Sequence, residues 1–193
     1  MEIVGKLRTA LPGDSKHKSQ ITILDCFFIH SIKTYIVIDV LTYGDQVFIN
    51  CEAEFRLFWL KNKFEEDNLS AQNKNDSVLT LNRFYDLANY NEIQECLQKY
   101  PFWNNNKPEL DGLLFYHKKS MYVEGKTPFV GWLYPFMLPE LFGYDFIQMH
   151  PEYYKQPENY VNYRVFIENF NNEIKNDIQM DDETIDVDSI KQL

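Results

Sequence analysis

The residue with the clearest chemical potential is Trp132, in a run from 127 to 135 that reads Thr-Pro-Phe-Val-Gly-Trp-Leu-Tyr-Pro. The β-branched and aromatic residues of this run are typical of a strand. An indole face can stack on a flat base, which contributes roughly 1–3 kcal/mol per base and more when the base is cationic. A tryptophan in a strand can also be a core residue. Both interpretations stay open on local grounds.

A second run precedes this one and reads Asp-Gly-Leu-Leu-Phe-Tyr-His-Lys over residues 111–118. The two runs predict paired strands over 110–117 and 127–134, with a glycine-bearing turn at Gly125. These two strands must therefore position Trp132.

The cysteines and histidines form no metal-binding pattern. Cys26, Cys51 and Cys96 lie far apart, and none of the four histidines forms an HxH or HxxxH pair. Structural and catalytic metals need closer ligand spacing, and an odd cysteine count favours reduced thiols. We expect no metal and no cofactor.

The net charge of −10 argues against a broad, sequence-blind grip on nucleic acid, DNA included, because such a grip needs many basic residues on one face. The charge is uneven. Residues 171–193 hold seven acids and two lysines, and we expect this tail to be disordered. The opening stretch carries Lys6 and Arg8.

The chain has no apolar window near 18 residues, so we expect no membrane span and a cytoplasmic and nuclear location.

Residue periodicity predicts an α+β fold in one domain over 1–170, followed by the tail over 171–193. We expect a β-hairpin from 21–29 and 34–42, then a helix from 51 to 64 that packs on the sheet. Its predicted apolar side comprises Phe55, Phe58, Trp59 and Leu60, with Arg56 among the polar residues between them. The remaining elements are a surface loop over 65–78, a helix over 91–100 capped by Asn91, a short turn or helix over 137–143, a loop over 150–163 and a helix over 163–178.

Two groups of motifs resemble the cap-binding domain of the snurportin family. The first comprises ILDC (23–26), YIVIDV (35–40) and the stretch from Cys51 to Trp59. The second comprises LDGLLFYHK (110–118) with TP (127–128), VGWL (130–133) and Pro135. The resemblance covers roughly residues 5–143 in consistent order and spacing. It implies a twisted, mostly antiparallel sheet with a few packed helices, as in mRNA guanylyltransferases.

The resemblance implies recognition of the trimethylguanosine cap of spliceosomal small nuclear RNA by an import adaptor. Trp132 is then the stacking surface for the methylated base. Lys118, Tyr122, Lys6 and Arg8 are further candidates for contacts with the RNA cap. By resemblance the partners are capped small nuclear RNA, importin-β and an exportin.

Other family features have no counterpart in this sequence. A second pocket tryptophan, a phosphate-contacting lysine and the Arg-rich segment that binds importin-β are not matched, so we expect an incomplete pocket and no importin-β binding by residues 1–193. Tyr134 stands where the family tends to have arginine. A protein-interaction module that kept the scaffold and lost the ligand is an alternative function.

The related enzymes offer a further alternative, guanylyl transfer, which needs a nucleophilic lysine in a Lys-x-Asp-Gly motif. The only Asp-Gly here is Asp111-Gly112, and Glu109 occupies the lysine position. We therefore expect a nucleotide-binding fold without the enzymatic chemistry.

Overall fold

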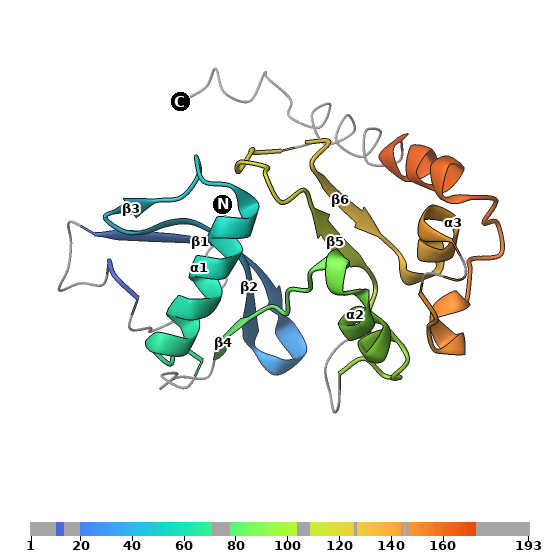
Figure 1. The fold of residues 1–193 in the computed structure, drawn as a ribbon, viewed down its shortest axis with the longest axis horizontal. Helices are drawn as coiled ribbons and strands as arrows, with labels where there is room; N and C mark the ends of the chain where they lie inside the picture. The colour runs from blue at the N-terminus through green and yellow to red at the C-terminus, as the bar shows by residue number, and fades with distance from the viewer. Residues whose placement is uncertain are drawn as a thin grey trace, which may run out of the picture. The chain divides into compact units, whose positions relative to one another are not determined.

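A computed structural model describes residues 11–13, 20–70, 78–103, 109–125, 127–143, 145 and 147–172. The chain forms two compact units, Met1–Tyr134 and Pro135–Leu193. Each unit is described by itself below (Figure 1).

The first unit is built on a four-stranded sheet. Strands β1 (Ile21–Ile29) and β2 (Thr34–Gly44) pair antiparallel, from Ile21 opposite Gly44 to Ile29 opposite Thr34, which confirms the predicted hairpin. Two β-bulges interrupt this register, after Ile23 and after Asp25. Strand β3 (Gln46–Val47) adds to β2 antiparallel, and β4 (Val78–Leu81) adds to β2 parallel.

Helix α1 (Ala53–Glu66) confirms the predicted helix and packs on the sheet. The core between them contains Val37, Val40, Tyr43, Phe48, Leu60, Phe64, Leu69 and Leu79. Trp59 packs against this core, with its ring centroid 4.4 Å from that of Phe48 and 5.1 Å from that of Tyr43. Trp59 is therefore half-buried against the core, as its place on the predicted apolar side of the helix implies.

The predicted apolar side of α1 is wrong in part. Phe55 and Phe58 are 50% and 64% exposed, whereas Arg56 is 1% exposed. The buried stripe is Ala53, Arg56, Leu60 and Phe64, which follows the helical spacing of three or four residues. The reason is the ion pair that Arg56 forms with Asp39, described below.

Two further predictions need correction. Val78 was predicted as the last residue of the loop over 65–78, but it is the first residue of strand β4. This segment is a strand because it pairs with β2. Helix α2 (Tyr90–Leu97) starts one residue before Asn91, so Asn91 is not its cap. Asp86 instead caps the preceding 3₁₀ turn (Leu87–Asn89), where its side chain accepts from the backbone N–H of Ala88.

Strands β5 (Leu113–Tyr116) and β6 (Val130–Leu133) form a separate antiparallel pair, called here the β5–β6 ribbon. Both are shorter than the predicted strands over 110–117 and 127–134. Leu114 lies opposite Trp132, and Tyr116 lies opposite Val130. The mixture of antiparallel sheets and separate helices confirms the α+β class.

The second unit contains the 3₁₀ turns Pro135–Met137 and Pro151–Tyr154, helix α3 (Leu138–Phe142) and a helical stretch over 163–172. The ring of Phe136 lies 4.9 Å from that of Tyr160 and 6.1 Å from that of Phe166. The helix predicted over 163–178 is confirmed as far as 172, and the rest lies outside the described residues. The predicted domain end at 170 stays a prediction. No helix among the described residues is long and apolar enough to span a membrane.

Candidate nucleotide-binding site

The β5–β6 ribbon carries Trp132 and Leu114 on one face, called here its open face, where both side chains are more exposed than Leu133 on the other face. Side chains alternate across a strand, so Trp132 and its cross-strand partner Leu114 share one face. Both are partly open to solvent, with Trp132 37% and Leu114 40% exposed, whereas Leu133 on the other face is buried. Tyr134 follows on the Trp132 face, and the two ring centroids lie 4.3 Å apart in an edge-on arrangement. The exposed indole can therefore meet a ligand.

Gly112 fixes where this indole lies. A Cβ at residue 112 would stand 2.1 Å from Nε1 and 2.2 Å from Cε2 of Trp132, far inside van der Waals contact. Only glycine, which has no Cβ, lets the indole lie directly against the backbone here. The glycine of the Asp111-Gly112 motif thus supports the candidate stacking residue.

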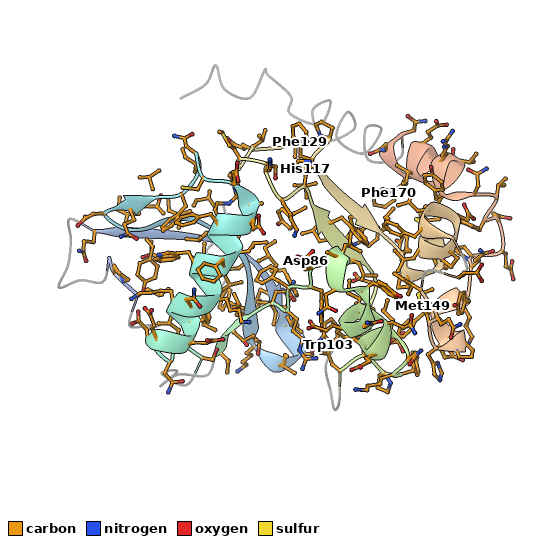
Figure 2. All side chains as sticks on the ribbon, viewed as in Figure 1. Asp86, Trp103, His117, Phe129, Met149 and Phe170 are labelled. Carbon is orange, nitrogen blue, oxygen red and sulfur yellow. The ribbon has the colours of Figure 1, made fainter. Side chains whose placement is uncertain are left out.

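His117 and Phe129 lie just beyond the end of the ribbon at which Tyr116 pairs with Val130, and Figure 2 shows them next to each other. The backbone N–H of His117 donates to the carbonyl of Phe129 at 2.8 Å, and the two rings lie 5.7 Å apart. This hydrogen bond continues the strand pairing one residue past Tyr116. Segment 118–122 begins directly after it.

Segment 118–122 caps the start of α1. The carbonyls of Ser120 and Lys118 accept from the backbone N–H groups of Ala53 and Glu54 at 2.8 and 3.0 Å. The first N–H groups of a helix have no partner within the helix, so these bonds satisfy two of them. The chain after the ribbon is thereby joined to the helix that covers the sheet.

A buried ion pair lies beside this junction. Arg56 Nε and Nη2 donate to the two carboxylate oxygens of Asp39 at 2.9 and 2.8 Å, and Nη1 donates to the carbonyls of Cys51 and Ser120 at 2.6 and 3.1 Å. Both side chains are buried. A guanidinium removed from water needs this degree of pairing. The pair joins β2, α1 and segment 118–122, and it is structural.

Tyr122 and Asp25 border the ion pair. Asp25 lies opposite Asp39 in the β1–β2 register, and the Tyr122 hydroxyl donates to Asp25 Oδ2 at 3.4 Å. Burial raises the pKa of Asp25 above its ordinary value, against the lowering effect of the Tyr122 hydrogen bond. Arg56 Cζ lies 5.9 Å from the centroid of the Tyr122 ring. This environment holds Tyr122 in place.

The nearby phenol and thiol stay neutral. Burial, together with the charges of Asp39 and Asp25, raises the pKa of Tyr116 well above its usual range. Burial and the charge of Asp25 raise the pKa of Cys26 to about 12. A thiol at that pKa is a poor nucleophile near neutral pH.

Lys118 is half exposed and paired. Its Nζ lies 2.6 Å from Asp86 Oδ2 and 3.7 Å from Glu54 Oε1. The hydrogen bond to Asp86 raises the pKa of Lys118, so the ammonium stays charged. A phosphate would have to compete with these two carboxylates.

The residues predicted for the site fall in two places. Trp132 lies on the open face of the ribbon. Lys118 and Tyr122 lie on segment 118–122, which follows the last pairing of the ribbon at His117 and Phe129. Lys6 and Arg8 lie outside the described residues. Among the described residues, no group of three or more His, Cys, Asp or Glu side chains is placed to hold a metal.

Comparison with protein-family models matches residues 1–135 to the family described as Snurportin1, m3G cap-binding domain. This match spans more than half of the 193 residues. The chain belongs to this family. The match ends just after the strand that carries Trp132, so both β1–β2 and the β5–β6 ribbon are parts of the shared cap-binding domain. The family description concerns a binding domain for the trimethylguanosine (m3G) cap.

Sequence reasoning missed the roles of Gly112, Asp39 and Arg56. An acid inside the apolar run Ile-Val-Ile-Asp-Val was a usable signal, because a buried carboxylate needs a cationic partner. The contact between Gly112 and Trp132 left no comparable signal, since the two residues are twenty positions apart.

Proposed function

We propose that this chain binds the trimethylguanosine cap of small nuclear RNA and that Trp132 is the stacking surface for the cap base. The observation that carries the proposal is the partly exposed indole held on Gly112 at the open face of the ribbon. Membership of the m3G cap-binding family supports the choice of ligand.

The chemistry of the ligand suits an indole. Methylation at the ring nitrogen gives the guanine a positive charge, and a cation is attracted to the electron-rich face of tryptophan. Tyr134 meets the indole edge-on and limits its rotation, which lowers the entropy lost on binding. Leu114 adds apolar surface beside it.

The phosphates of the cap need cations. Lys118 is the candidate among the described residues, because it is charged and half exposed. Lys6 and Arg8 remain candidates from the sequence. Tyr122 is a further candidate, and its hydroxyl would donate to a phosphate in place of Asp25. Phosphate contacts of this kind weaken with added salt.

The proposal extends to a role in nuclear import of small nuclear ribonucleoproteins, with transit between cytoplasm and nucleus. Importin-β and an exportin are the expected partners of such an adaptor. This part rests on the family resemblance, and for residues 1–193 alone we expect no importin-β in a pull-down. Recovery of importin-β with this chain would contradict that expectation.

A protein-interaction role is the second candidate function. Phe55 and Phe58 are both exposed on α1, and exposed aromatic residues are enriched in protein interfaces. Replacing both with serine should leave cap binding unchanged if the two functions are separate.

Covalent nucleotide transfer is not expected, because Glu109 stands where the transferring enzymes need lysine. Incubation with labelled GTP and a divalent metal should leave the chain unlabelled on a denaturing gel. A labelled band at 23.1 kDa would overturn the binding-only proposal.

The cap proposal is tested by anisotropy of a fluorescently labelled trimethylguanosine cap dinucleotide. Loss of one stacked base costs about 1–3 kcal/mol, so Trp132→Ala should weaken binding about 5- to 150-fold. Trp103→Ala is the matched control, because the Trp103 ring packs on Phe102 and Figure 2 shows it well apart from His117 and Phe129. Equal affinity of Trp132→Ala and the parent, both folded by circular dichroism, would remove Trp132 from the site.

A further inference from the structure

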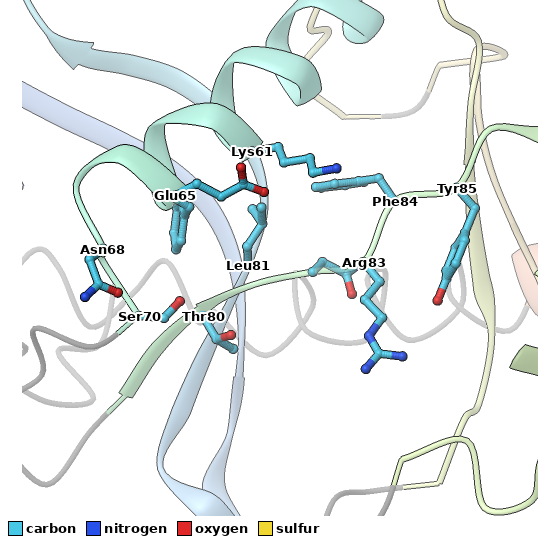
Figure 3. Close-up of a pocket in the computed structure, with 11 residues that line it drawn as sticks. Lys61, Glu65, Asn68, Ser70, Thr80, Leu81, Arg83, Phe84 and Tyr85 are labelled. Carbon is cyan, nitrogen blue, oxygen red and sulfur yellow. The ribbon is translucent and has the colours of Figure 1, made fainter. Parts of the chain in front are cut away.

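A groove on the first unit has a lining that no part of the cap proposal uses. It lies between the C-terminal half of α1 and the chain from β4 to Tyr85, and its volume is about 500 Å³ (Figure 3). Helix α1 and the residues after it contribute Lys61, Glu65, Asn68 and Ser70. The other wall contributes Thr80, Asn82, Arg83, Phe84 and Tyr85.

The groove has a local excess of positive charge in an acidic chain. Lys61 and Arg83 come from opposite walls, and Glu65 is the acid that lines it. Lys63, two residues from Lys61 on the same helix, is already paired with Asp67 at 3.0 Å. In the described part of the chain no carboxylate forms an ion pair with Lys61 or Arg83. Lys61 is therefore available to an anion. Arg83 forms a hydrogen bond with the Tyr85 hydroxyl, and its guanidinium has further N–H donors for an anion.

The groove also offers an aromatic ring. Phe84 is half-buried, and Figure 3 shows its ring and the Lys61 side chain extending toward each other. Aromatic rings beside cations along a groove are the common device for holding single-stranded nucleic acid, since every base has a flat face. Asn68 and Asn82 carry both donors and acceptors, which base edges require.

The wall that carries Phe84 is anchored on both sides. The backbone N–H of Asn82 donates to the carbonyl of Val37 at 2.9 Å and extends the pairing of β4 with β2. The Tyr85 hydroxyl contacts Cys96 Sγ at 3.2 Å and also forms a hydrogen bond with Arg83. A groove fixed in this way loses little conformational entropy when a ligand binds.

We propose that this groove binds a nucleotide of single-stranded RNA, with the base on Phe84 and the flanking phosphates on Lys61 and Arg83. The ligand class is uncapped RNA, so the inference goes beyond the cap site and does not require it. An acidic peptide would use the two cations alone. The ring and the two amides favour RNA.

The experiment uses the full chain and an uncapped eight-nucleotide single-stranded RNA with a 3′ fluorophore. Anisotropy is measured over a range of salt concentrations. Phe84→Ala should weaken binding about fivefold or more, the effect of losing one stacked base. Phe84→Leu keeps apolar bulk, so it should fold, and it should also lose affinity.

The charge variants sharpen the test. Each phosphate contact with a single strand contributes about 0.7 to the slope of log affinity against log salt. Lys61→Gln and Arg83→Gln should each reduce the slope by about that amount. Lys63→Gln makes the same change in charge on the same helix outside the groove, and it should leave the slope unchanged.

The cap site is tested separately in the same samples. Trp132→Ala should leave binding of the uncapped RNA unchanged, and Phe84→Leu should leave binding of the cap dinucleotide unchanged. If the parent does not bind the cap dinucleotide, that result would therefore count against the cap proposal alone. The groove proposal is overturned if the parent does not bind the RNA, if Lys63→Gln matches Lys61→Gln, or if an oligoglutamate peptide displaces the RNA as well as unlabelled RNA does.

Discussion

The Arg56–Asp39 pair and the Trp132–Gly112 contact differ in how much of each side chain is left exposed to bind a ligand. At the ion pair each of the three guanidinium nitrogens donates a hydrogen bond, and neither side chain reaches solvent. At Trp132 the indole lies against the Gly112 backbone, and more than a third of the side chain stays exposed. The first arrangement leaves no capacity to bind anything else. The second leaves an aromatic surface for a ligand.

The contrast separates a scaffold from a site within one unit. The ion pair joins β2, α1 and segment 118–122, so its loss should damage the fold. The Gly112 contact holds one side chain in place, so its loss should damage binding first. Each of the following variants tests one side of this comparison.

The largest effect is expected from Arg56→Met. The change leaves the Asp39 carboxylate buried without its cation, which costs about 3–5 kcal/mol of the free energy of unfolding. Urea unfolding measures it. Lys119→Met, at an exposed lysine of the same unit, should change stability by less than about 0.5 kcal/mol.

A double variant checks that the cost comes from the uncompensated charge. Arg56→Met with Asp39→Leu removes both charges, and it should recover much of the lost stability. If Arg56→Met alone unfolds at the urea concentration of the parent, the ion pair is not a structural joint.

Gly112→Ala should act mainly on binding. The new methyl group would overlap the indole, so Trp132 must leave its place, at a stability cost of about 1–3 kcal/mol. Affinity for the trimethylguanosine cap should fall as far as in Trp132→Ala. Both quantities come from unfolding and cap titration of the same preparation.

Gly131→Ala is the matched control on the partner strand, because no atom lies within 4 Å of a Cβ at that residue. It should bind the cap as the parent does. Cap binding of parental strength by Gly112→Ala would show that the position of the indole does not matter.

These two sites also mark what the sequence could predict. The β1–β2 hairpin, α1 and the β5–β6 ribbon follow from local periodicity, and all three were found. Arg56 was assigned to the polar side of α1 because the buried side is decided by Asp39, seventeen residues away in β2. No helical period carries that information.

The ribbon shows the same limit at the candidate site. Trp132 can be predicted as a candidate stacking residue from the stretch 127–135 alone, because a strand pattern and a motif are local features of the sequence. From the sequence, Gly112 is only part of a motif. The reason that residue 112 must lack a Cβ is the indole of Trp132, which lies on the other strand. Strand β4 was missed because its parallel pairing with β2, more than forty residues earlier, decides its structure.

The smallest effect is a pH dependence at Asp25. Burial raises the pKa of Asp25 above its ordinary 3.8, so the folded chain binds this proton more tightly than the unfolded chain. The contribution of Asp25 to stability is therefore greatest when it is protonated, and it falls as the pH rises from 3.8 through the folded pKa.

Asp25→Asn removes this titration and can still accept from Tyr122. Relative to the parent, the variant should gain free energy of unfolding as the pH rises over that window, and the gain should level off above the folded pKa. Urea unfolding at a series of pH values gives the difference. A difference that stays constant with pH would contradict the raised pKa.

The central claim is that the cap base stacks on Trp132, and intrinsic tryptophan fluorescence of two complementary variants tests it most directly. The double variant Trp59→Phe and Trp103→Phe leaves Trp132 as the sole tryptophan. We predict that a trimethylguanosine cap dinucleotide quenches its fluorescence to saturation. One stacked base supplies about 1–3 kcal/mol of the roughly 8 kcal/mol that micromolar affinity needs, so the dissociation constant should be weaker than micromolar. Trp132→Phe, which keeps the other two tryptophans, should show no saturable quenching. Saturable quenching in Trp132→Phe and none in the Trp132-only protein would contradict the account.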